Sequence, residues 1–404
     1  MKILIGCLLT PLLAVVAFAA ASHKVMVPVV ITAPLIIEDH RIFVDAQFTR
    51  TDGTLRTARL WVDTGTPDFQ ITEKLAKDLG VDMSSPPIQS DDGVKQIPVH
   101  LLQVQIGGMA LDLQSARPMA VPASSNVFAG SQTEGNLPAT ILMHYQVVLD
   151  IPRRSLTLIQ AGAQRPKGKR VSCLVQPTTG MVQMEATIDG QKYTLALDSG
   201  SPYSMISRDA MKTWSAHHPD WQKITGAAGA ASVLGIPRLL RAPMMRIPQI
   251  QWGALALPDV GALGMDSEFV NWYSKKTAAP VIGFLAWNVL RAFRVTIDYP
   301  HAAVYFKKLG QIDRHDIDAV GLAVTRSRSG GYAVVAVVQK DGHPTVDDVQ
   351  PGDKLLKVDD RDVTKLALEK VMDALSGRPG DVHALTLDRK GTTLIVKAKV
   401  MHLI

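Results

Sequence analysis

The chain has 404 residues and a formal net charge of +6, with 47% hydrophobic and 5% aromatic residues. This length and composition predict two to three domains with mostly aliphatic cores. The basic residues are spread along the chain. The one basic cluster, residues 165–170, contains no aromatic residue, so it favours a solvated linker and argues against nucleic-acid binding.

Residues 1–21 are typical of a signal peptide. Lys2 provides the positive start, an uncharged apolar run follows, and residues 17–19 and 19–21 are small-x-small cleavage candidates. A membrane anchor that is never cleaved is the alternative, but the apolar run is short for a span. The sequence therefore predicts an exported protein.

The chain has two cysteines, and Cys7 lies within the predicted signal peptide. The mature chain keeps only Cys173 and cannot form an internal disulfide. Export without disulfides favours the periplasm or cell envelope of a Gram-negative bacterium, although secretion also fits. Cys173 lies in an apolar stretch and is expected to be a buried, unreactive thiol.

The first half of the chain leads to an Asp-Thr-Gly motif at Asp63. Alternating residues in the range 28–50 predict strands, residues 51–54 predict a hairpin turn, and the returning strand ends at Asp63. A short helix is expected at residues 73–79. Residues 90–93 then predict either a mobile flap over a ligand or a plain hairpin turn.

The same order of elements recurs around Asp198, at an offset of 198 − 63 = 135 residues. The elements expected there are strands at 182–188 and 193–197, a turn at 189–190, a helix at 208–214 and a candidate flap at 226–230. Further on, residues 135–158 and 283–306 align without a gap. A chain that repeats in this way is one structural unit used twice.

Two such loops brought face to face would place the carboxyl groups of Asp63 and Asp198 against each other. Like charges at that distance cannot both ionise readily, so the pair is expected to share one proton. The ionised carboxylate can take a proton from water, and the protonated one can donate a hydrogen bond to a substrate carbonyl. The pattern predicts amide hydrolysis with no metal ion, no cofactor and no covalent intermediate.

The stretches 63–65, Asp-Thr-Gly, and 198–200, Asp-Ser-Gly, resemble the two active-site loops of aspartic proteases. The resemblance implies that Asp63 and Asp198 are the catalytic pair. The residues that would support the two loops are Thr64, Gly65, Ser199 and Gly200.

The resemblance extends to a second element, an apolar-apolar-Gly stretch that supports each loop. Residues 281–283, Val-Ile-Gly, match it, whereas residues 133–135, Thr-Glu-Gly, keep the glycine and lose both apolar residues. The implied fold is mainly β, with two pseudo-symmetric lobes at residues 24–162 and 170–310. Both lobes lie in one chain, as in pepsin-like enzymes, but the short lobes without disulfides are more similar to a duplicated retroviral type.

The pattern changes from about residue 321, where a small α+β domain is expected at residues 318–402. Its predicted elements are a strand at 333–338, an amphipathic helix at 366–375 and closing strands at 384–387 and 393–400. Residues 349–360 resemble the Pro-Gly-Asp-x-Leu-Leu-x-Val segment of bacterial PDZ domains. The resemblance implies that a peptide adds as a strand beside Gly330, Gly331 and Tyr332. The alternative is a domain that only docks on the lobes.

Together these features predict an aspartic endopeptidase that cleaves protein or peptide substrates, with a PDZ-like domain that captures a peptide. No His-Glu-x-x-His, paired Cys-x-x-Cys or Gly-x-Ser-x-Gly motif occurs, and the eleven histidines do not cluster at metal-ligand spacing. The alternative is a catalytically silent peptide-binding protein that keeps the protease fold. A complete aspartate pair in one chain favours a monomer.

Overall fold

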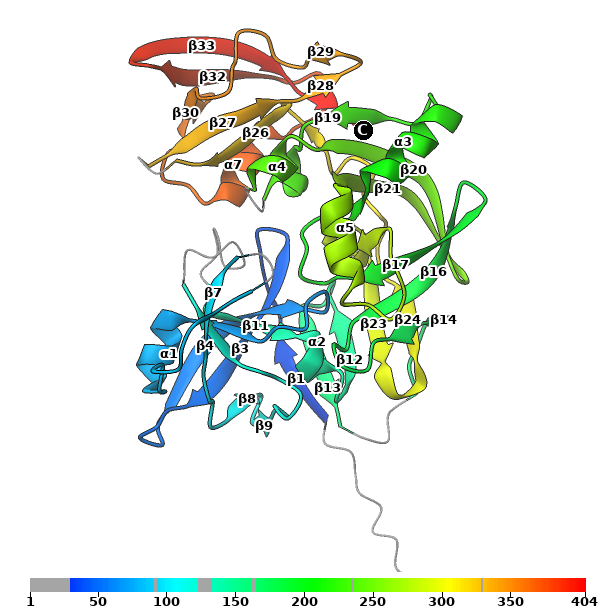
Figure 1. Ribbon diagram of the computed structural model, residues 1–404. Helices are drawn as coiled ribbons and strands as arrows, with labels where there is room; N and C mark the ends of the chain where they lie inside the picture. Colours follow the sequence, from blue (N-terminus) through cyan, green and yellow to red (C-terminus); the bar gives the residue numbers. More distant parts are fainter. Residues whose placement is uncertain (1–29, 91–92, 123–132, 161–164, 234–235, 328–329) are drawn as a thin grey trace, which may run out of the picture.

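The computed structural model of the protein describes residues 30–90, 93–122, 133–160, 165–233, 236–327 and 330–404 (Figure 1). The predicted signal peptide, residues 1–21, lies outside the described residues. The described chain is mainly β, as the sequence predicts. No helix within the described ranges is both long and apolar enough to cross a membrane.

The first lobe, called lobe 1, is built on a ten-stranded sheet whose strands lie between Ile36 and Pro138, with the order β6-β7-β10-β5-β11-β4-β3-β8-β9 and with β2 beside β3. Its long hairpin, β3 (Arg41–Thr49) and β4 (Leu55–Asp63), turns through Gly53 at a φ of +82°. The last four residues of β4 are buried, so this strand carries Asp63 into the interior. The other elements are β2 (Ile36–Glu38), β5 (Gln70–Thr72), α1 (Glu73–Leu79), β6 (Ile88–Gln89), β7 (Lys95–Pro98), β8 (Val104–Ile106), β9 (Met109–Ala110), β10 (Met119–Val121), β11 (Gly135–Pro138) and α2 (Ala139–Leu142).

Lobe 2, residues 170–310, repeats this plan in a second ten-stranded sheet, β15-β16-β17-β22-β18-β21-β20-β19-β28-β29. Its elements are β15 (Leu174–Val175), β16 (Val182–Ile188), β17 (Gln191–Leu197), β18 (Met205–Ser207), α3 (Arg208–His217), β19 (Lys223–Thr225), the 3₁₀ helix η1 (Gly229–Ser232), α4 (Pro237–Leu240), β20 (Pro243–Trp252), β21 (Leu255–Met265), α5 (Ser267–Ser274), β22 (Gly283–Leu285) and α6 (Trp287–Leu290). The last two strands of this sheet, β28 (Gln339–Lys340) and β29 (His343–Pro344), come from the C-terminal domain.

Matched hydroxyl residues begin the helix that follows each aspartate loop. The Oγ1 atom of Thr72 accepts a hydrogen bond from the backbone N–H of Leu75 at 3.1 Å and caps α1. Ser207 caps α3 in the same way, through its bond from the N–H of Asp209 at 3.2 Å. Hydroxyl side chains at this position satisfy N–H groups that the helix leaves unpaired.

A six-stranded sheet, β1-β13-β12-β23-β24-β14, joins the lobes. At its centre β12 pairs antiparallel with β23, and Val148 lies opposite Thr296. These two residues occupy equivalent positions in the gapless repeat, so the lobes meet as two copies meet across a two-fold axis. The elements of this region are β1 (Val30–Pro34), β12 (Gln146–Asp150), β13 (Ser155–Ile159), β14 (Lys169–Ser172), β23 (Phe293–Asp298), η2 (Tyr299–His301) and β24 (Ala303–Lys308).

The C-terminal domain has the strand order β26-β27-β30-β32-β33, with β31 beside β30, and it packs its own apolar core with α7. Its elements are β25 (Asp318–Ala319), β26 (Leu322–Arg326), β27 (Tyr332–Val337), β30 (Lys354–Val358), β31 (Arg361–Asp362), α7 (Leu368–Leu375), β32 (Val382–Arg389), β33 (Thr392–Lys399) and β34 (Met401–His402).

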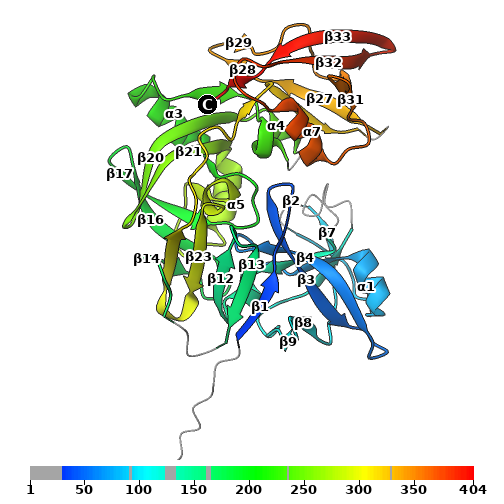
Figure 2. The same cartoon turned by 180° about the vertical axis from the view of Figure 1, so that it is seen from behind.

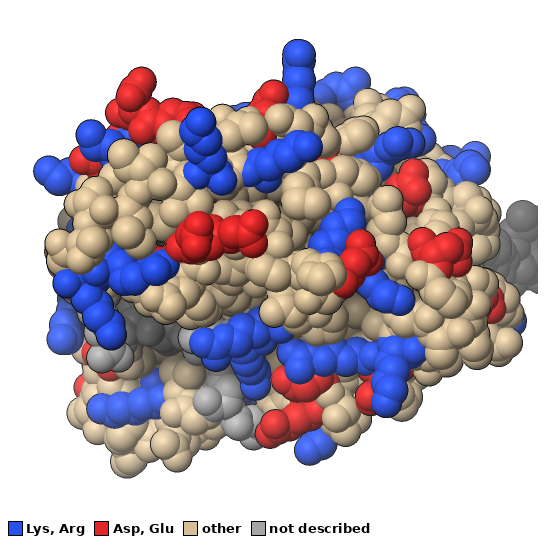
Figure 3. Space-filling model, turned by 90° about the horizontal axis from the view of Figure 1, so that it is seen from above, with Lys and Arg blue, Asp and Glu red and all other residues tan. Residues whose placement is uncertain are grey.

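The C-terminal domain contacts both lobes. Figures 1 and 2 show it beside lobe 2, whose sheet continues into it because Thr225 of β19 pairs with Gln339 of β28. On the lobe 1 side, the turn between β2 and β3 reaches the start of α7, where Glu369 N–H donates to the carboxylate of Asp39 at 3.2 Å. Figure 3 shows Lys and Arg side chains interspersed with Asp and Glu on the upper face.

Candidate active site

The structure brings the two predicted aspartates together at the junction of the lobes. Asp63 ends β4, and Asp198 directly follows β17. Each carboxylate accepts a hydrogen bond from its own loop: the N–H of Gly65 donates to Asp63 Oδ1 at 2.9 Å, and the N–H of Gly200 donates to Asp198 Oδ1 at 2.9 Å. Asp198 Oδ1 also accepts from the N–H of Ser201 at 3.0 Å. Both side chains are buried, at 8% and 7% exposure.

Thr64 and Ser199 connect the two loops through reciprocal hydrogen bonds. The Oγ1 atom of Thr64 accepts from the N–H of Ser199 at 2.9 Å and donates to the carbonyl of Leu197 at 3.0 Å. In mirror fashion, Ser199 Oγ accepts from the N–H of Thr64 at 3.1 Å and donates to the carbonyl of Val62 at 2.9 Å. Each hydroxyl therefore forms hydrogen bonds with the opposite lobe.

The glycines of the motif let the loops approach each other. A Cβ atom on Gly65 would collide with the carboxyl group of Asp198, and one on Gly200 would collide with the carboxyl group of Asp63. Any larger residue at either position would push the carboxyls apart. The requirement for glycine here is therefore one of space.

Burial and proximity change the acidity of the two aspartates. Burial raises the pKa of Asp198 to about 6, and the N–H donors of Gly200 and Ser201 oppose the rise. Burial, and next the negative charge of Asp198, raise the pKa of Asp63 well above its ordinary value. Both carboxyls therefore keep a proton to higher pH than an ordinary aspartate does, and the two titrate as one pair.

The aspartates lie in a cavity of about 440 Å³ whose two walls differ in character. The lobe 1 wall is largely polar and contains Asp68, Gln70, Ser90, Gln96 and Asn136. The lobe 2 wall is largely apolar and contains Met205, Ile236, Leu239, Phe269, Trp272, Tyr273 and Phe284. A concave site with apolar lining and a few convergent polar groups is the usual form of a ligand site.

One ion pair crosses this cavity. Lys276 Nζ of lobe 2 lies 3.1 Å from Asp68 Oδ2 of lobe 1, and the same ammonium lies 4.2 Å from the centre of the Trp272 ring. Nearby, the hydroxyl of Tyr273 is buried and has no hydrogen-bond partner among the described residues. Burial raises its pKa well above the ordinary value, and the charges of Asp198 and Asp63 add to the rise. This hydroxyl is thus an uncommitted donor close to the two aspartates.

Sequence reasoning did not identify the apolar wall. Helix α5 places Phe269, Trp272 and Tyr273 on the cavity, at i, i+3 and i+4 spacing that could have indicated one helical face. Two tryptophans, Trp61 of lobe 1 and Trp272 of lobe 2, line the cavity.

The two candidate flaps have different outcomes. In lobe 1, Ser90 lines the cavity, and Asp91 and Asp92 of the predicted flap tip lie outside the described residues. In lobe 2, the expected mobile loop at 226–230 is wrong: Ala227 and Ala228 are fully buried. This segment packs against the C-terminal domain, as its shared apolar cluster with Ala323 of β26 indicates.

The supporting glycines also occupy corresponding places. In β11, Gly135 pairs with Leu60 of β4 and with Ile71 of β5. In β22, Gly283 pairs with Leu195 of β17 and with Ile206 of β18. Each glycine thus lies between the strand that leads to the aspartate and the strand that follows it.

Residues 313–387 match the PDZ domain family. This part of the chain is a PDZ domain. The structure extends the unit beyond the match, because Met401 and His402 of β34 pair with β25 at its start. No curated protein matches the chain.

The open strand edge of the PDZ domain differs from the one expected. Tyr332 belongs to β27, which pairs with β26 on one side and with β30 on the other, so β27 cannot accept a further strand. Gly330 and Gly331 lie in the turn before it. Among the residues that the structure describes, β26 pairs with β27 alone and is the edge strand beside α7.

A segment of lobe 2 lies against this edge. Helix η1 contacts both α7 and β26, and Ser232 Oγ lies 3.5 Å from the sulfur of Met372 on α7. The side chain of Ser232 is fully buried. The two elements between which a peptide would add therefore already touch lobe 2 in this structure.

Proposed function

We propose that the two lobes form an aspartic endopeptidase, which hydrolyses peptide bonds of protein substrates. The observation that carries this proposal is the buried pair of carboxyls, Asp63 and Asp198, held by mutual hydrogen bonds of Thr64 and Ser199. An arrangement that raises the pKa of both carboxyls and opens onto a cavity fits catalysis better than structural support.

We assign one role to each aspartate. Asp198, whose raised pKa is about 6, is the base of the pair, so it accepts a proton from the attacking water. Asp63, whose pKa is raised well above its ordinary value, is the acid of the pair, so it donates a hydrogen bond to the scissile carbonyl and stabilises the charge that develops there. The hydroxyl of Tyr273 provides a further donor for the bound peptide. No metal ion or cofactor takes part in this scheme.

The proposed mechanism determines the pH dependence of activity. With both carboxyls protonated there is no base, so activity should rise as pH increases through about 6, the pKa of Asp198. It should fall again only when Asp63, whose pKa is also raised, loses its proton. A plot of kcat/KM against pH should therefore be bell-shaped with a near-neutral optimum. Maximal activity well below pH 5 would contradict this assignment.

The decisive experiment is cleavage of an unfolded protein mixture by the chain from about residue 22, beside Asp63→Asn and Asp198→Asn. Each variant should lose activity by roughly 10³-fold or more, because one partner of the acid–base pair is gone. Asp82→Asn is a matched control, since Asp82 is exposed and is not among the residues that line the cavity. It should retain most of the activity.

A thermal unfolding curve distinguishes lost chemistry from lost folding. Both aspartates have a higher pKa in the folded than in the unfolded chain. Their contribution to stability is therefore largest at low pH and declines as pH rises above about 4, and for Asp198 the decline continues through about 6. At pH 7 an asparagine at either position should not lower the melting temperature. Normal cleavage of the protein mixture by Asp63→Asn or by Asp198→Asn would exclude these two aspartates as the catalytic pair.

A catalytically silent peptide-binding protein is the second candidate function. The observation that favours it is the PDZ domain, a family that binds peptides as an added strand. We expect a peptide to add beside β26 once η1 moves away from that edge, and the PDZ domain then to hold the peptide near the lobes. A folded wild-type chain that binds peptides but cleaves nothing at any pH would favour this candidate. Either function fits an exported, monomeric protein that does not bind nucleic acid.

A further inference from the structure

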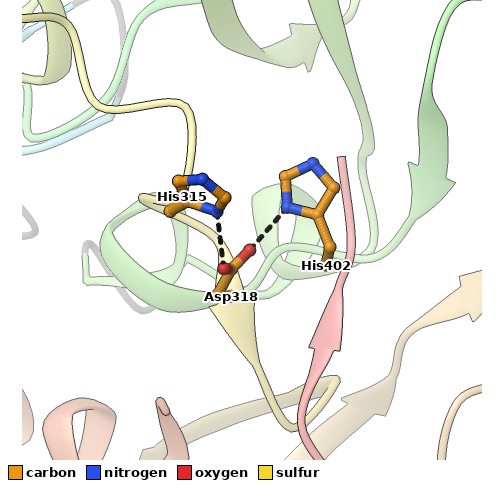
Figure 4. A group of neighbouring side chains, drawn as sticks. All are labelled: His315, Asp318 and His402. Carbon is orange, nitrogen blue, oxygen red and sulfur yellow. Dashed lines mark hydrogen bonds and ion pairs between the residues drawn. The ribbon is translucent and has the colours of Figure 1, made fainter. Parts of the chain in front are cut away.

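Three ligand-bearing side chains meet where lobe 2 joins the PDZ domain, far from the aspartate pair in the sequence (Figure 4). The Nδ1 atom of His315 lies 2.8 Å from Asp318 Oδ2, and the Nδ1 atom of His402 lies 2.6 Å from Asp318 Oδ1. One atom from each residue lies within 4.8 Å of the other two. Among the described residues, no other group of His, Cys, Asp and Glu meets this condition.

The backbone fixes all three positions. Asp318 and His402 are directly opposite each other in the antiparallel pair β25–β34, so their side chains project to the same face. His315 precedes β25 in a turn, in which the N–H of Asp318 donates to the carbonyl of His315 at 3.1 Å. Two ligands therefore come from a strand pair and the third from a closed turn. The spacing along the sequence hides this group, because His402 joins it only through the pairing of the chain ends.

The charges nearby leave Asp318 available to a cation. Asp313 is paired with Arg291 at 2.9 Å, and Asp316 is paired with Arg246 at 2.7 Å. In contrast, the ion-pair partners of Asp318 among the described residues are both imidazoles. An imidazole whose Nδ1–H faces a carboxylate becomes a metal ligand at Nδ1 when that proton moves to Nε2, so the ring itself stays neutral and the carboxylate supplies the negative charge.

We propose that His315, Asp318 and His402 bind a divalent transition metal ion, with Zn²⁺ as the best match. Two imidazole nitrogens and one carboxylate oxygen suit Zn²⁺, Co²⁺ or Ni²⁺, whereas Ca²⁺ and Mg²⁺ require mostly oxygen ligands. The side chain of His315 is 55% exposed, so water can complete a four-coordinate shell. On binding, the ion takes the place of the two Nδ1 protons between the rings and the carboxylate, and each neutral ring keeps its one proton on Nε2.

Bound metal would cross-link the two ends of the PDZ domain. His315 lies near the start of residues 313–387, and His402 lies beyond the last long strand, β33. Because the three ligands come together only in the folded chain, binding of the ion stabilises the folded domain. The site therefore ties the two ends of the PDZ domain together. This inference does not depend on the proposed catalytic activity.

The test is titration of the chain, purified without a histidine tag and freed of metal, with Zn²⁺ alone by isothermal calorimetry. One Zn²⁺ should bind per chain, and Co²⁺ should give the visible absorption of a four-coordinate ion. Saturating Zn²⁺ should raise the melting temperature by about 2–4 °C. His315→Gln and His402→Gln should each weaken binding by about tenfold or more. His315→Gln changes an exposed side chain, so it should fold normally.

The chain supplies a matched control in a second His–His–Asp group. His217 and His218 lie 3.2 and 2.5 Å from the carboxylate of Asp189, but this group does not bring its three ligand atoms together as the first does. The double variant His217→Gln/His218→Gln should bind Zn²⁺ as the wild type does. No binding by the wild type, or equal binding by wild type and His402→Gln, would overturn the proposal. Loss of binding in the control variant would also overturn it.

Discussion

Lobe 1 supports its aspartate loop with polar side chains, whereas lobe 2 supports the corresponding loop with apolar ones. Before β11, Thr133 Oγ1 donates to the carbonyl of Arg59 at 2.9 Å, and Glu134 forms an ion pair with Arg56 at 2.7 Å. Before β22, Val281 is buried and Ile282 packs against the main core. The two lobes therefore hold corresponding segments, those before β11 and β22, with different side chains.

The backbone of this element is the same in both lobes. The N–H of Thr72 donates to the carbonyl of Glu134 at 2.8 Å, and the N–H of Ser207 donates to the carbonyl of Ile282 at 2.7 Å. A side chain that points away from the aspartate can change, provided that the main-chain bond is kept. The departure from the apolar pattern at Thr133 and Glu134 thus leaves the strand beneath Asp63 intact.

The two walls of the cavity also carry different side chains, and these side chains lie where a substrate would bind. The polar wall of lobe 1 includes Gln96 and Asn136, and the apolar wall of lobe 2 includes Phe269 and Trp272. Symmetric backbone therefore places the reactive carboxyls, and asymmetric side chains would select the substrate.

The largest expected effect comes from adding a methyl group to the supporting glycines. A Cβ atom on Gly283 would collide with the backbone oxygen of Met205, whereas one on Gly135 would lie 2.9 Å from the oxygen of Gln70. Gly283→Ala should cost about 3 kcal/mol of unfolding free energy and Gly135→Ala about 1–2 kcal/mol. Chemical denaturation, fitted with one m-value for the wild type and the variants, would measure both losses of unfolding free energy. Equal losses of unfolding free energy would show that the space around the two glycines is equally restricted in both lobes.

The features that could be predicted from sequence are those that the local backbone requires. The paired motifs at Asp63 and Asp198, the caps at Thr72 and Ser207, and the glycines between strands all follow from turn and space requirements. The predicted helix at 73–79 coincides with α1, for the same reason.

The features that were missed depend on contacts between distant parts of the chain. The segment at Ala227 and Ala228 has a flexible composition, yet packing against the PDZ domain buries it. The edge strand of the PDZ domain is β26 and not the strand at Tyr332, because pairing on both sides of β27 is a property of the assembled sheet. Sequence periodicity carries no information on such long-range choices.

The next effect tests whether the loops support each other equally. Thr64→Val and Ser199→Ala each remove a hydroxyl that makes two hydrogen bonds across the lobes. Each variant should lose about 2–3 kcal/mol of unfolding free energy and should also lose activity, because the carboxyls are no longer held in register. Thr64→Ser keeps the hydroxyl and is the conservative control. It should retain most of the unfolding free energy and most of the activity. If only one of the two variants, Thr64→Val or Ser199→Ala, lost stability and activity, the two loops would not support each other equally.

A smaller effect is expected when the two cavity walls are altered. Trp272→Ala removes a large apolar surface from the lobe 2 wall, and Gln96→Ala removes a polar group from the lobe 1 wall. Trp272→Ala should lower kcat/KM about tenfold for cut sites with a large apolar side chain on that side, and it should spare sites with small ones. Mass spectrometry of the cleavage products would show the change in preference. Unchanged cut sites in both variants would exclude these walls as the source of specificity.

The smallest effect should come from exchanging the support residues between the lobes. Glu134→Ile introduces the lobe 2 residue into lobe 1, and it removes an ion pair with Arg56 that is partly exposed, at 22% and 21%. Such a pair contributes little, so the loss should be about 1 kcal/mol or less. The reverse change, Ile282→Glu, places a carboxylate against the apolar core and should cost about 2 kcal/mol or more. Denaturation of the two single variants measures this difference. A larger loss for Glu134→Ile would mean that the ion pair, and not the main-chain bond from Thr72, holds the strand beneath Asp63.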